Sequence, residues 1–236
     1  MSDIWTMVWK ESKDLLFQGG WRSLIRPLFV IGIMGIYLPL QFGPQWVALT
    51  PLGMLLLLWI PFFVVISFIG DAIAGERERH TLETLLASRI PDRAILLGKI
   101  VATVLYAWGM GILSLLLGLV LVDLFRTQGN WMFYPLGLFV VALVLSLLAA
   151  VLATSAGVLV SLKVATVRQA QQILSVSTIV FVFGVTFLLR ALPANLFSSL
   201  NYAQFLLIVI AFLAVLDAIL LGISLVSFQR SRLILN

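Results

Sequence analysis

The sequence contains no cysteine and only one histidine among its 236 residues. The missing cysteines exclude disulfide bonds and thiolate metal sites. We interpret the single histidine, His80, as a solvated side chain, because it lies in a densely charged loop. The zinc-peptidase motif H-E-x-x-H and a nucleophile elbow are also missing. We therefore expect no catalytic residue and no metal site in this chain.

Charge is scarce as well, at 11% of residues against 62% hydrophobic residues and a mean hydropathy of +1.14. A spanning helix needs about 20 mainly apolar residues. The apolar runs are continuous and do not alternate, which excludes a membrane β-barrel. The sequence thus predicts an all-α membrane protein that forms one domain over residues 1–236. Six spans are expected, over residues 24–42, 47–70, 94–122, 133–161, 172–191 and 203–227.

Two features of these spans depart from a regular pattern. Arg26, Pro27 and Pro39 interrupt the first span, which makes it the least regular of the six. The third and fourth spans are longer than a bilayer requires, so we expect them to tilt, kink or extend into water.

The basic residues predict the orientation. Thirteen of the 15 Lys and Arg residues lie on one side of the predicted spans, and only Arg126 and Arg190 lie on the other. By the positive-inside rule, both termini and the charged loop face the cytoplasm. We therefore expect an integral protein of the cytoplasmic membrane. The net charge of +5 reflects this topology. Nucleic acid is excluded as a partner, because no basic patch is interleaved with aromatic residues.

Residues 1–20 are predicted to form an amphipathic helix that contacts membrane lipids in the cytoplasmic interface, with tryptophans at headgroup depth. The segment lacks the uninterrupted apolar core of a signal peptide. The alternative is a plain soluble helix. The apolar stripe consists of Ile4, Trp5, Val8, Trp9, Leu15 and Leu16. The charged residues elsewhere on the helical wheel are Asp3, Lys10, Glu11, Lys13 and Asp14.

Residues 70–99 hold ten of the chain's 25 Asp, Glu, Lys and Arg residues. Each charge at mid-membrane would cost about 2.5–3.5 kcal/mol or more, so this segment must be an aqueous loop between two spans. Within it, residues 81–88 have apolar Leu82, Leu85 and Leu86 at helical spacing, and Pro91 ends the helix. A short amphipathic helix of this kind can receive a force from a cytosolic partner. The alternative is that its leucines rest on the membrane surface.

The alternating run Glu76-Arg77-Glu78-Arg79 precedes that helix. Alternating charges usually form a solvated face, where each exposed pair contributes about 0–1 kcal/mol. However, the run directly follows the second span, so pairing within the chain would fix the loop to the membrane domain. At the other end of the loop, we expect Lys99 to anchor the third span. Gly98-Lys99 resembles a phosphate-binding loop, but Ile100 stands where Ser or Thr is needed, so we expect no nucleotide site.

Asp217 lies near the middle of the sixth predicted span, in the run A-V-L-D-A-I-L-L. An ionised carboxylate exposed to lipid would be costly there, so Asp217 must face protein or water, or be protonated. It either lines a path or gates a proton, or it joins the sixth span to a neighbour, for example through Ser or Thr. The sequence leaves both interpretations open.

The charged loop carries a family resemblance. The run A-G-E-R-E-R-H-T-L-E-T-L-L-A-S, followed by R-A-I-L-L-G-K, resembles the signature of type-2 ABC transporter permeases. A second segment, T-x-R-Q-A-Q-Q at 166–172, is similar to the segment that opens the family's fifth span. His80 replaces the family's usual Gly, and Arg89 replaces a frequent Pro. These departures affect the tilt of the cytoplasmic helix and not the resemblance itself.

The resemblance implies the permease subunit of an ABC exporter, without catalysis or cofactor of its own. Two cytosolic ATPase subunits would bind ATP and magnesium, and a second permease, identical or paralogous, would complete the substrate path. The coupling segment would cover residues 76–90. Its coupling residues would be Glu76, Arg77, Glu78, Arg79, Thr81, Leu82, Glu83, Leu85 and Leu86.

A stand-alone ion-coupled carrier or channel is the alternative function. A carrier normally shows several intramembrane charges or repeated broken helices, and a channel shows a filter loop or a ring of charge. The spans of this sequence are nearly bare of charge. The apolar spans are compatible with lipids, glycolipids or hydrophobic drugs as substrates, and peptides, polysaccharides and ions stay open.

Overall fold

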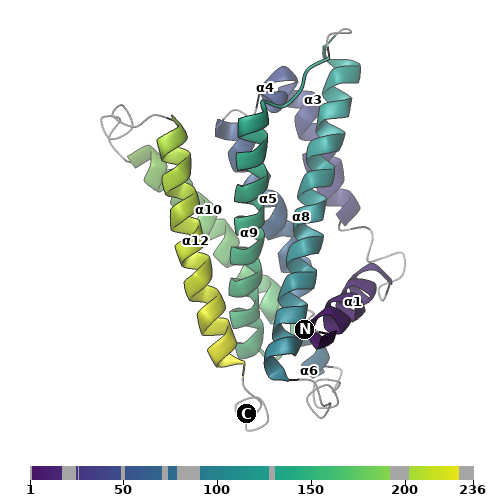
Figure 1. Cartoon of the computed structure of the whole chain (residues 1–236), viewed down its shortest axis with the longest axis vertical. Coiled ribbons are helices and arrows are strands. Elements are labelled where there is room, and N and C mark those ends of the chain that lie inside the picture. The colour runs from purple at the N-terminus through teal and green to yellow at the C-terminus, as the bar shows by residue number, and fades with distance from the viewer. Residues whose placement is uncertain are drawn as a thin grey trace.

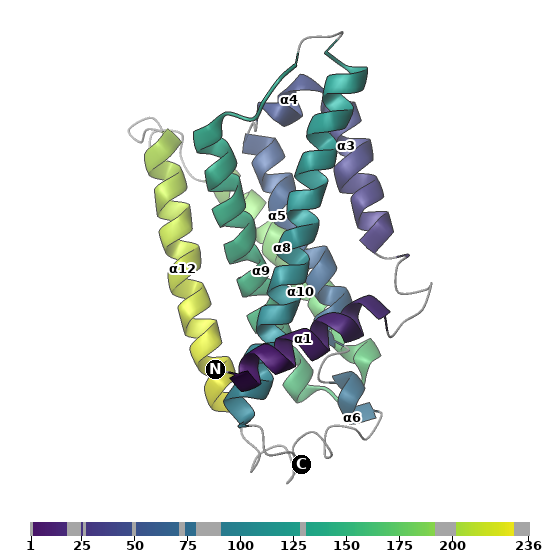
Figure 2. The same cartoon turned by 45° about the vertical axis from the view of Figure 1, so that its right-hand side comes forward.

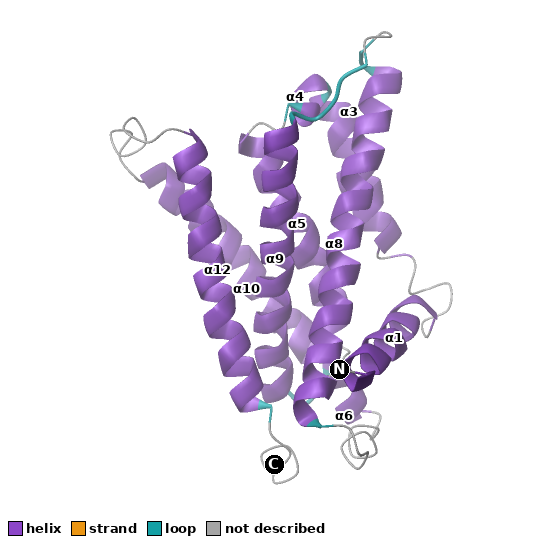
Figure 3. Cartoon of the chain, viewed as in Figure 1, coloured by secondary structure: helices purple, strands orange, loops and turns teal. Residues whose placement is uncertain are grey.

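The computed structural model describes residues 2–17, 25, 27–48, 51–70, 74–78, 91–127, 131–191 and 202–228. Every regular element within these ranges is helical (Figure 3). The long helices are α1 (Ser2–Phe17), α5 (Pro51–Gly70), α8 (Asp92–Phe125), α9 (Leu136–Lys163), α10 (Val167–Ala191) and α12 (Tyr202–Ser227). The short elements are the π-helix η1 (Ile31–Tyr37) and the α-helices α3 (Leu38–Phe42), α4 (Pro44–Val47) and α6 (Glu76–Glu78).

The long helices α5, α8, α9, α10 and α12 form an elongated bundle (Figure 1). The N-terminal helix α1 lies across one end of this bundle, where α6 and the first turns of α8 also lie (Figure 2). We call this the α1 end. The short helices α3 and α4 lie at the opposite end, which we call the α4 end (Figure 1, Figure 2). The expectation of an all-α architecture is confirmed.

Three helices in the described part of the chain are long and apolar enough to cross a membrane, namely Asp92–Phe125, Leu136–Lys163 and Ala203–Ser227. They coincide with the predicted third, fourth and sixth spans. Helices α5 and α10 occupy the regions predicted for the second and fifth spans. The chain is therefore an integral membrane protein, and the count of six spans stays a prediction.

The region of the first predicted span forms a shorter apolar helix over Pro27–Phe42. This helix is irregular, as expected, and it continues through Pro39 as η1 and α3. A proline ring inside an α-helix clashes with the carbonyl group four residues earlier. Here the preceding turn is π-helical, and the backbone N–H of Leu38 donates to the Ile33 carbonyl group five residues before it. This wider turn accommodates the proline.

Helix α8 has 34 residues, which corresponds to about 51 Å at 1.5 Å per residue. The hydrocarbon core of a bilayer is only about 30 Å thick, so α8 extends into the interface or water. Lys99 is the eighth residue of this helix. It therefore lies close to the α1 end, where a charged side chain can be paired outside the hydrocarbon layer.

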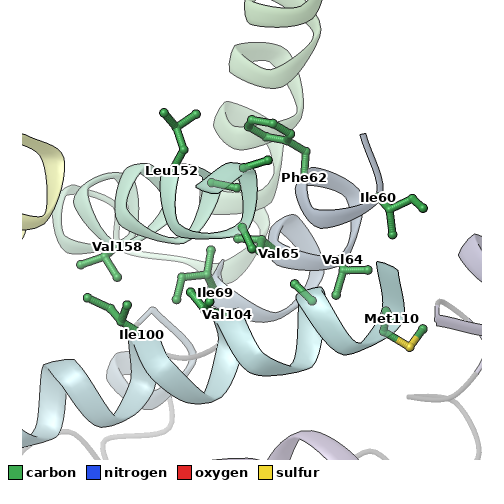
Figure 4. Close-up of a cluster of buried hydrophobic side chains, with 14 of the residues drawn as sticks. Ile60, Phe62, Val64, Val65, Ile69, Ile100, Val104, Met110, Leu152 and Val158 are labelled. Atoms are coloured by element: carbon green, nitrogen blue, oxygen red, sulfur yellow. The ribbon is translucent and has the colours of Figure 1, made fainter. Parts of the chain in front are cut away.

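The core lies between α5, α8 and α9, with Val65 and Ile69 of α5 facing Ile100 and Val104 of α8 (Figure 4). Gly157 of α9 allows the closest approach in this core, because a Cβ atom at this position would overlap the Ile69 side chain. Small residues permit such close contacts between membrane helices. The three helices are therefore closely packed against one another, and the α1 end adjoins them.

Candidate functional site

Lys99 forms the centre of a buried ionic cluster at the α1 end. Its side chain is 1% exposed. Its Nζ atom donates hydrogen bonds to Oε1 of Glu11 at 3.0 Å and to Oε1 of Glu76 at 2.8 Å. We call Lys99, Glu11 and Glu76 the Lys99 triad. A buried ammonium group without partners would cost several kcal/mol (about 3–5), so these two carboxylates are what permits a lysine at this position.

The triad joins three elements that are distant in sequence. Glu11 belongs to α1, Glu76 opens α6 and the predicted coupling segment, and Lys99 belongs to α8. The two carboxylates lie 88 and 23 residues from Lys99 in the sequence. The triad therefore links the N-terminal helix, the start of the charged loop and the base of a long membrane helix.

Helix α1 reaches the triad because its inner face packs on α8. Met7 and Val8 are both buried in this contact region. A Cβ atom at Gly98 would lie only 2.5 Å from the Met7 Cβ atom, so a glycine is required for this approach. The roles of Gly98 and Lys99 are thus structural and unrelated to phosphate binding. Gly98 leaves space for α1 to pack on α8, and Lys99 forms an ion pair with Glu11 of α1.

Lys10 lies on the outer side of the triad. Its Nζ atom is 3.6 Å from Oε1 of Glu11 and 4.0 Å from Oε1 of Glu76. It also lies 4.0 Å from Oδ2 of Asp14, one turn further along α1. Because Lys10 is exposed, water and ions screen these pairs, and each contributes little to stability. Lys99, and not Lys10, is therefore the cation on which the cluster depends.

The chain that leads into α6 is fixed at a second point. The backbone N–H of Ala74 donates to the Ser161 Oγ atom in the last turn of α9, at 3.1 Å. Ala74 and Ser161 are both completely buried. The beginning of the charged loop is thus attached to α9 through Ala74 and to α8 through Glu76. A displacement of this segment must strain both contacts.

The two glutamates of the predicted run Glu76-Arg77-Glu78-Arg79 have different environments in the structure. Glu76 makes the pairing within the chain that was one of the two interpretations of this run. Glu78 is exposed, as the other interpretation expects. The Arg77 side chain lies outside the described residues. The same is true of six predicted site residues, namely Arg79, Thr81, Leu82, Glu83, Leu85 and Leu86.

The residues of the predicted apolar stripe on the N-terminal helix also differ in their burial. Val8 packs inward, whereas Trp5 and Trp9 are 70% and 61% exposed on the other side of α1. The Lys13 Nζ atom lies 3.7 Å from the centre of the Trp9 ring, a cation–π contact. The apolar residues of α1 therefore face two directions. Val8 packs toward α8, and the two tryptophans are exposed on the side that is predicted to face the membrane interface. Leu15 and Leu16 have no described side chains.

Asp217 of α12 is 4% exposed, and both of its carboxyl oxygens are buried without a hydrogen-bond partner among the described residues. The expected link to a Ser or Thr is thus not found in this part of the chain. The polar contact between α12 and α9 lies two turns further on. There the Ser224 Oγ atom donates to the Leu220 carbonyl at 2.8 Å and approaches the Ser155 carbonyl at 3.4 Å. Asp217 and the Lys99 triad lie on different elements.

Glu11 is the site residue that sequence reasoning missed. It was placed with the other charges on the polar side of the helical wheel. The available signal was the spacing of Glu11 from Met7 and Val8, four and three residues earlier, which puts all three on one helical face. That signal becomes meaningful only once α1 is known to cross α8 at Gly98.

Three helices that are long and apolar enough to cross a membrane define an integral membrane component. The comparison with known families specifies it further. The sequence model of the family described as "ABC-2 family transporter protein" matches residues 27–235, which is most of the chain. The chain therefore belongs to the ABC-2 transporter family, and it is a membrane subunit of an ABC transporter. A comparison with curated proteins finds no match. Members of this family associate with ABC ATPases and are not themselves catalytic.

Proposed function

We propose that this chain is the permease subunit of an ABC exporter in the cytoplasmic membrane. Two separate cytosolic ATPase subunits bind ATP and magnesium and supply the energy. A second permease, identical or paralogous, completes the substrate path. The single observation that carries this proposal is the attachment of Glu76 to Lys99, because it connects the start of the charged loop to a membrane helix.

Force enters through the segment 76–90. Its leucines Leu82, Leu85 and Leu86 dock in a groove of the ATPase, and the flanking charges pair at the rim. The contacts at the beginning of this segment support the proposal. The Ala74–Ser161 and Glu76–Lys99 bonds connect it to α9 and α8, two of the helices long enough to cross a membrane. Movement of the loop is therefore transmitted to the bundle.

The topology in this proposal has six spans, with both termini and the α1 end in the cytoplasm. The charge distribution supports it. Helix α1, α6, the first turns of α8 and the end of α9 together carry Lys10, Lys13, Arg77, Arg93, Lys99 and Lys163. The α4 end has Arg126, just beyond α8. The positive-inside rule assigns the basic end to the cytoplasm.

Purification of the chain from its native membranes tests this function. We expect an affinity-tagged chain in mild detergent to carry a bound ABC ATPase, with ATP hydrolysis that vanadate inhibits. The alternative of an ion-coupled carrier or channel predicts a chain that purifies alone. If the chain purifies alone and proteoliposomes show an ion-gradient-driven flux without ATP, the proposed function is wrong.

A further inference from the structure

We propose that Glu11 is a positioning residue for energy coupling, which acts through Lys99 to make the N-terminal helix α1 part of the lever that begins at Glu76. This inference rests on the proposed function, since a lever has a role only if an ATPase moves the loop. Helix α1 precedes the residues that match the ABC-2 family model, which begin at residue 27.

The first argument is the burial of the cation. The Lys99 side chain is almost completely enclosed, and its two carboxylate partners both come from elements other than α8. If α6 moved away from α8 alone, Lys99 would keep only Glu11 and would be less compensated in a low-dielectric site. Breaking a buried pair in this way is strongly unfavourable. Concerted movement of α1, α6 and the base of α8 avoids that penalty.

The second argument is the packing of α1. The Met7–Gly98 contact leaves no space between α1 and α8, because even a methyl group at position 98 would collide with Met7. Such close contacts between helices transmit displacement and do not absorb it. Helix α1 lies across the end of the bundle (Figure 2). A displacement of its inner face against α8 would therefore move the whole helix along the membrane interface.

Asp14 provides a matched control on the same helix. It lies one turn from Lys10 and three residues after Glu11, and its described ion pair is a 4.0 Å contact with Lys10 at the surface. Glu11→Gln and Asp14→Asn both replace a carboxylate by an amide of similar size. Only the first change removes a charged partner of the buried Lys99. A general effect of charge on α1 would appear in both variants.

The first test measures position and needs no ATPase. Because the chain has no cysteine, single cysteines at Lys13 and Glu78, both exposed, can be introduced directly and spin-labelled. We expect one narrow distance distribution between α1 and α6 in the parent and in Asp14→Asn. Glu11→Gln should broaden it clearly. An unchanged distribution in Glu11→Gln would overturn the inference and leave the proposed function intact.

The second test measures coupling in the purified permease–ATPase complex. We expect Glu11→Gln to retain the bound ATPase but to lower vanadate-sensitive hydrolysis by about threefold or more, as for residues that transmit coupling. Glu11→Asp keeps a carboxylate on α1 and should retain more of the rate than Glu11→Gln. If Glu11→Gln hydrolyses ATP like the parent, or if Glu11→Asp is no better than Glu11→Gln, Glu11 has no positioning role.

Discussion

Gly98 and Met7 are in contact where α1 crosses α8, and a Cβ atom at position 98 would lie 2.5 Å from that of Met7. Together with the Glu11–Lys99 bond, this contact holds α1 against α8. It also makes Gly98 a position at which a small change has a large expected effect.

Gly98→Val should weaken the attachment of α1, because inserting bulk into a tight contact costs about 1–3 kcal/mol. Thermal unfolding in detergent would measure this loss. Gly109→Val on the same helix is the control, since a Cβ atom there meets nothing within 4 Å. Equal melting temperatures for the two variants would show that α1 does not depend on the glycine.

Lys99→Met should be destabilising by about 3–5 kcal/mol, since it leaves Glu11 and Glu76 near each other without their buried cation. The triple change Lys99→Met, Glu11→Gln and Glu76→Gln should recover most of this loss, because it removes the whole charged cluster. Lys10→Met should have a small effect, because Lys10 is exposed. A triple variant no more stable than Lys99→Met would contradict the ionic origin of the effect.

Replacing Leu82, Leu85 and Leu86 by Asp should abolish ATPase association while the chain still inserts in the membrane. The expected reason is the loss of the apolar face that enters the ATPase groove. Copurification and membrane fractionation measure the two properties separately. Asp14→Asn, on α1 and outside segment 76–90, should retain the ATPase. Normal association of the leucine triple variant would exclude docking through this face.

Trp5 and Trp9 should lie at the headgroups of the inner leaflet, because both are exposed on the side of α1 that carries Lys13. Since the chain has seven tryptophans, their signal is the difference between the parent and a Trp5→Phe, Trp9→Phe variant. We expect this difference emission to be blue-shifted and quenched by lipids with shallow quenchers. Emission typical of water, with no lipid quenching, would place α1 outside the interface.

Asp217→Leu should leave assembly intact, because neither carboxyl oxygen has a described hydrogen bond to lose and an unpartnered buried polar group is unfavourable. Ser224→Ala should instead cost about 1 kcal/mol, since the α9–α12 contact is made there. Thermal unfolding compares the stability of the two variants.

If Asp217→Leu prevents assembly and Asp217→Asn does not, Asp217 is a structural hydrogen-bonding residue. If assembly survives but ATP-driven transport is lost in Asp217→Asn, the side chain lines or gates the path.

The sequence predicted the helices well where continuous hydrophobicity alone determines that a segment forms a long helix. Continuous apolar runs define α8, α9 and α12, because hydrocarbon leaves the backbone no alternative to helix. The π-helical turn before Pro39 was not predicted, because composition does not reveal it.

The candidate site was predicted only in part. Pairing within the chain was one of two interpretations of the run that begins with Glu76, and Lys99 was expected to anchor the third span. The bond between these two residues comes from the structure. Glu11 lies 88 residues from Lys99, and its role depends on the tertiary contact that Gly98 permits. A helical wheel ranks Glu11 with the solvent-facing charges because it contains no information about the neighbouring helix.

The central claim is that the segment following Glu76 docks on an ABC ATPase, and photo-crosslinking from Leu85 in native membranes tests it most directly. A photoreactive amino acid at Leu85 should yield one adduct that is heavier than this chain by the mass of an ATPase subunit, which is identified by its nucleotide-binding motif. The same amino acid at Ile219, exposed on α12, should yield no such adduct. Failure to form an ATPase adduct at Leu85, or equal ATPase adducts at both positions, would contradict the account.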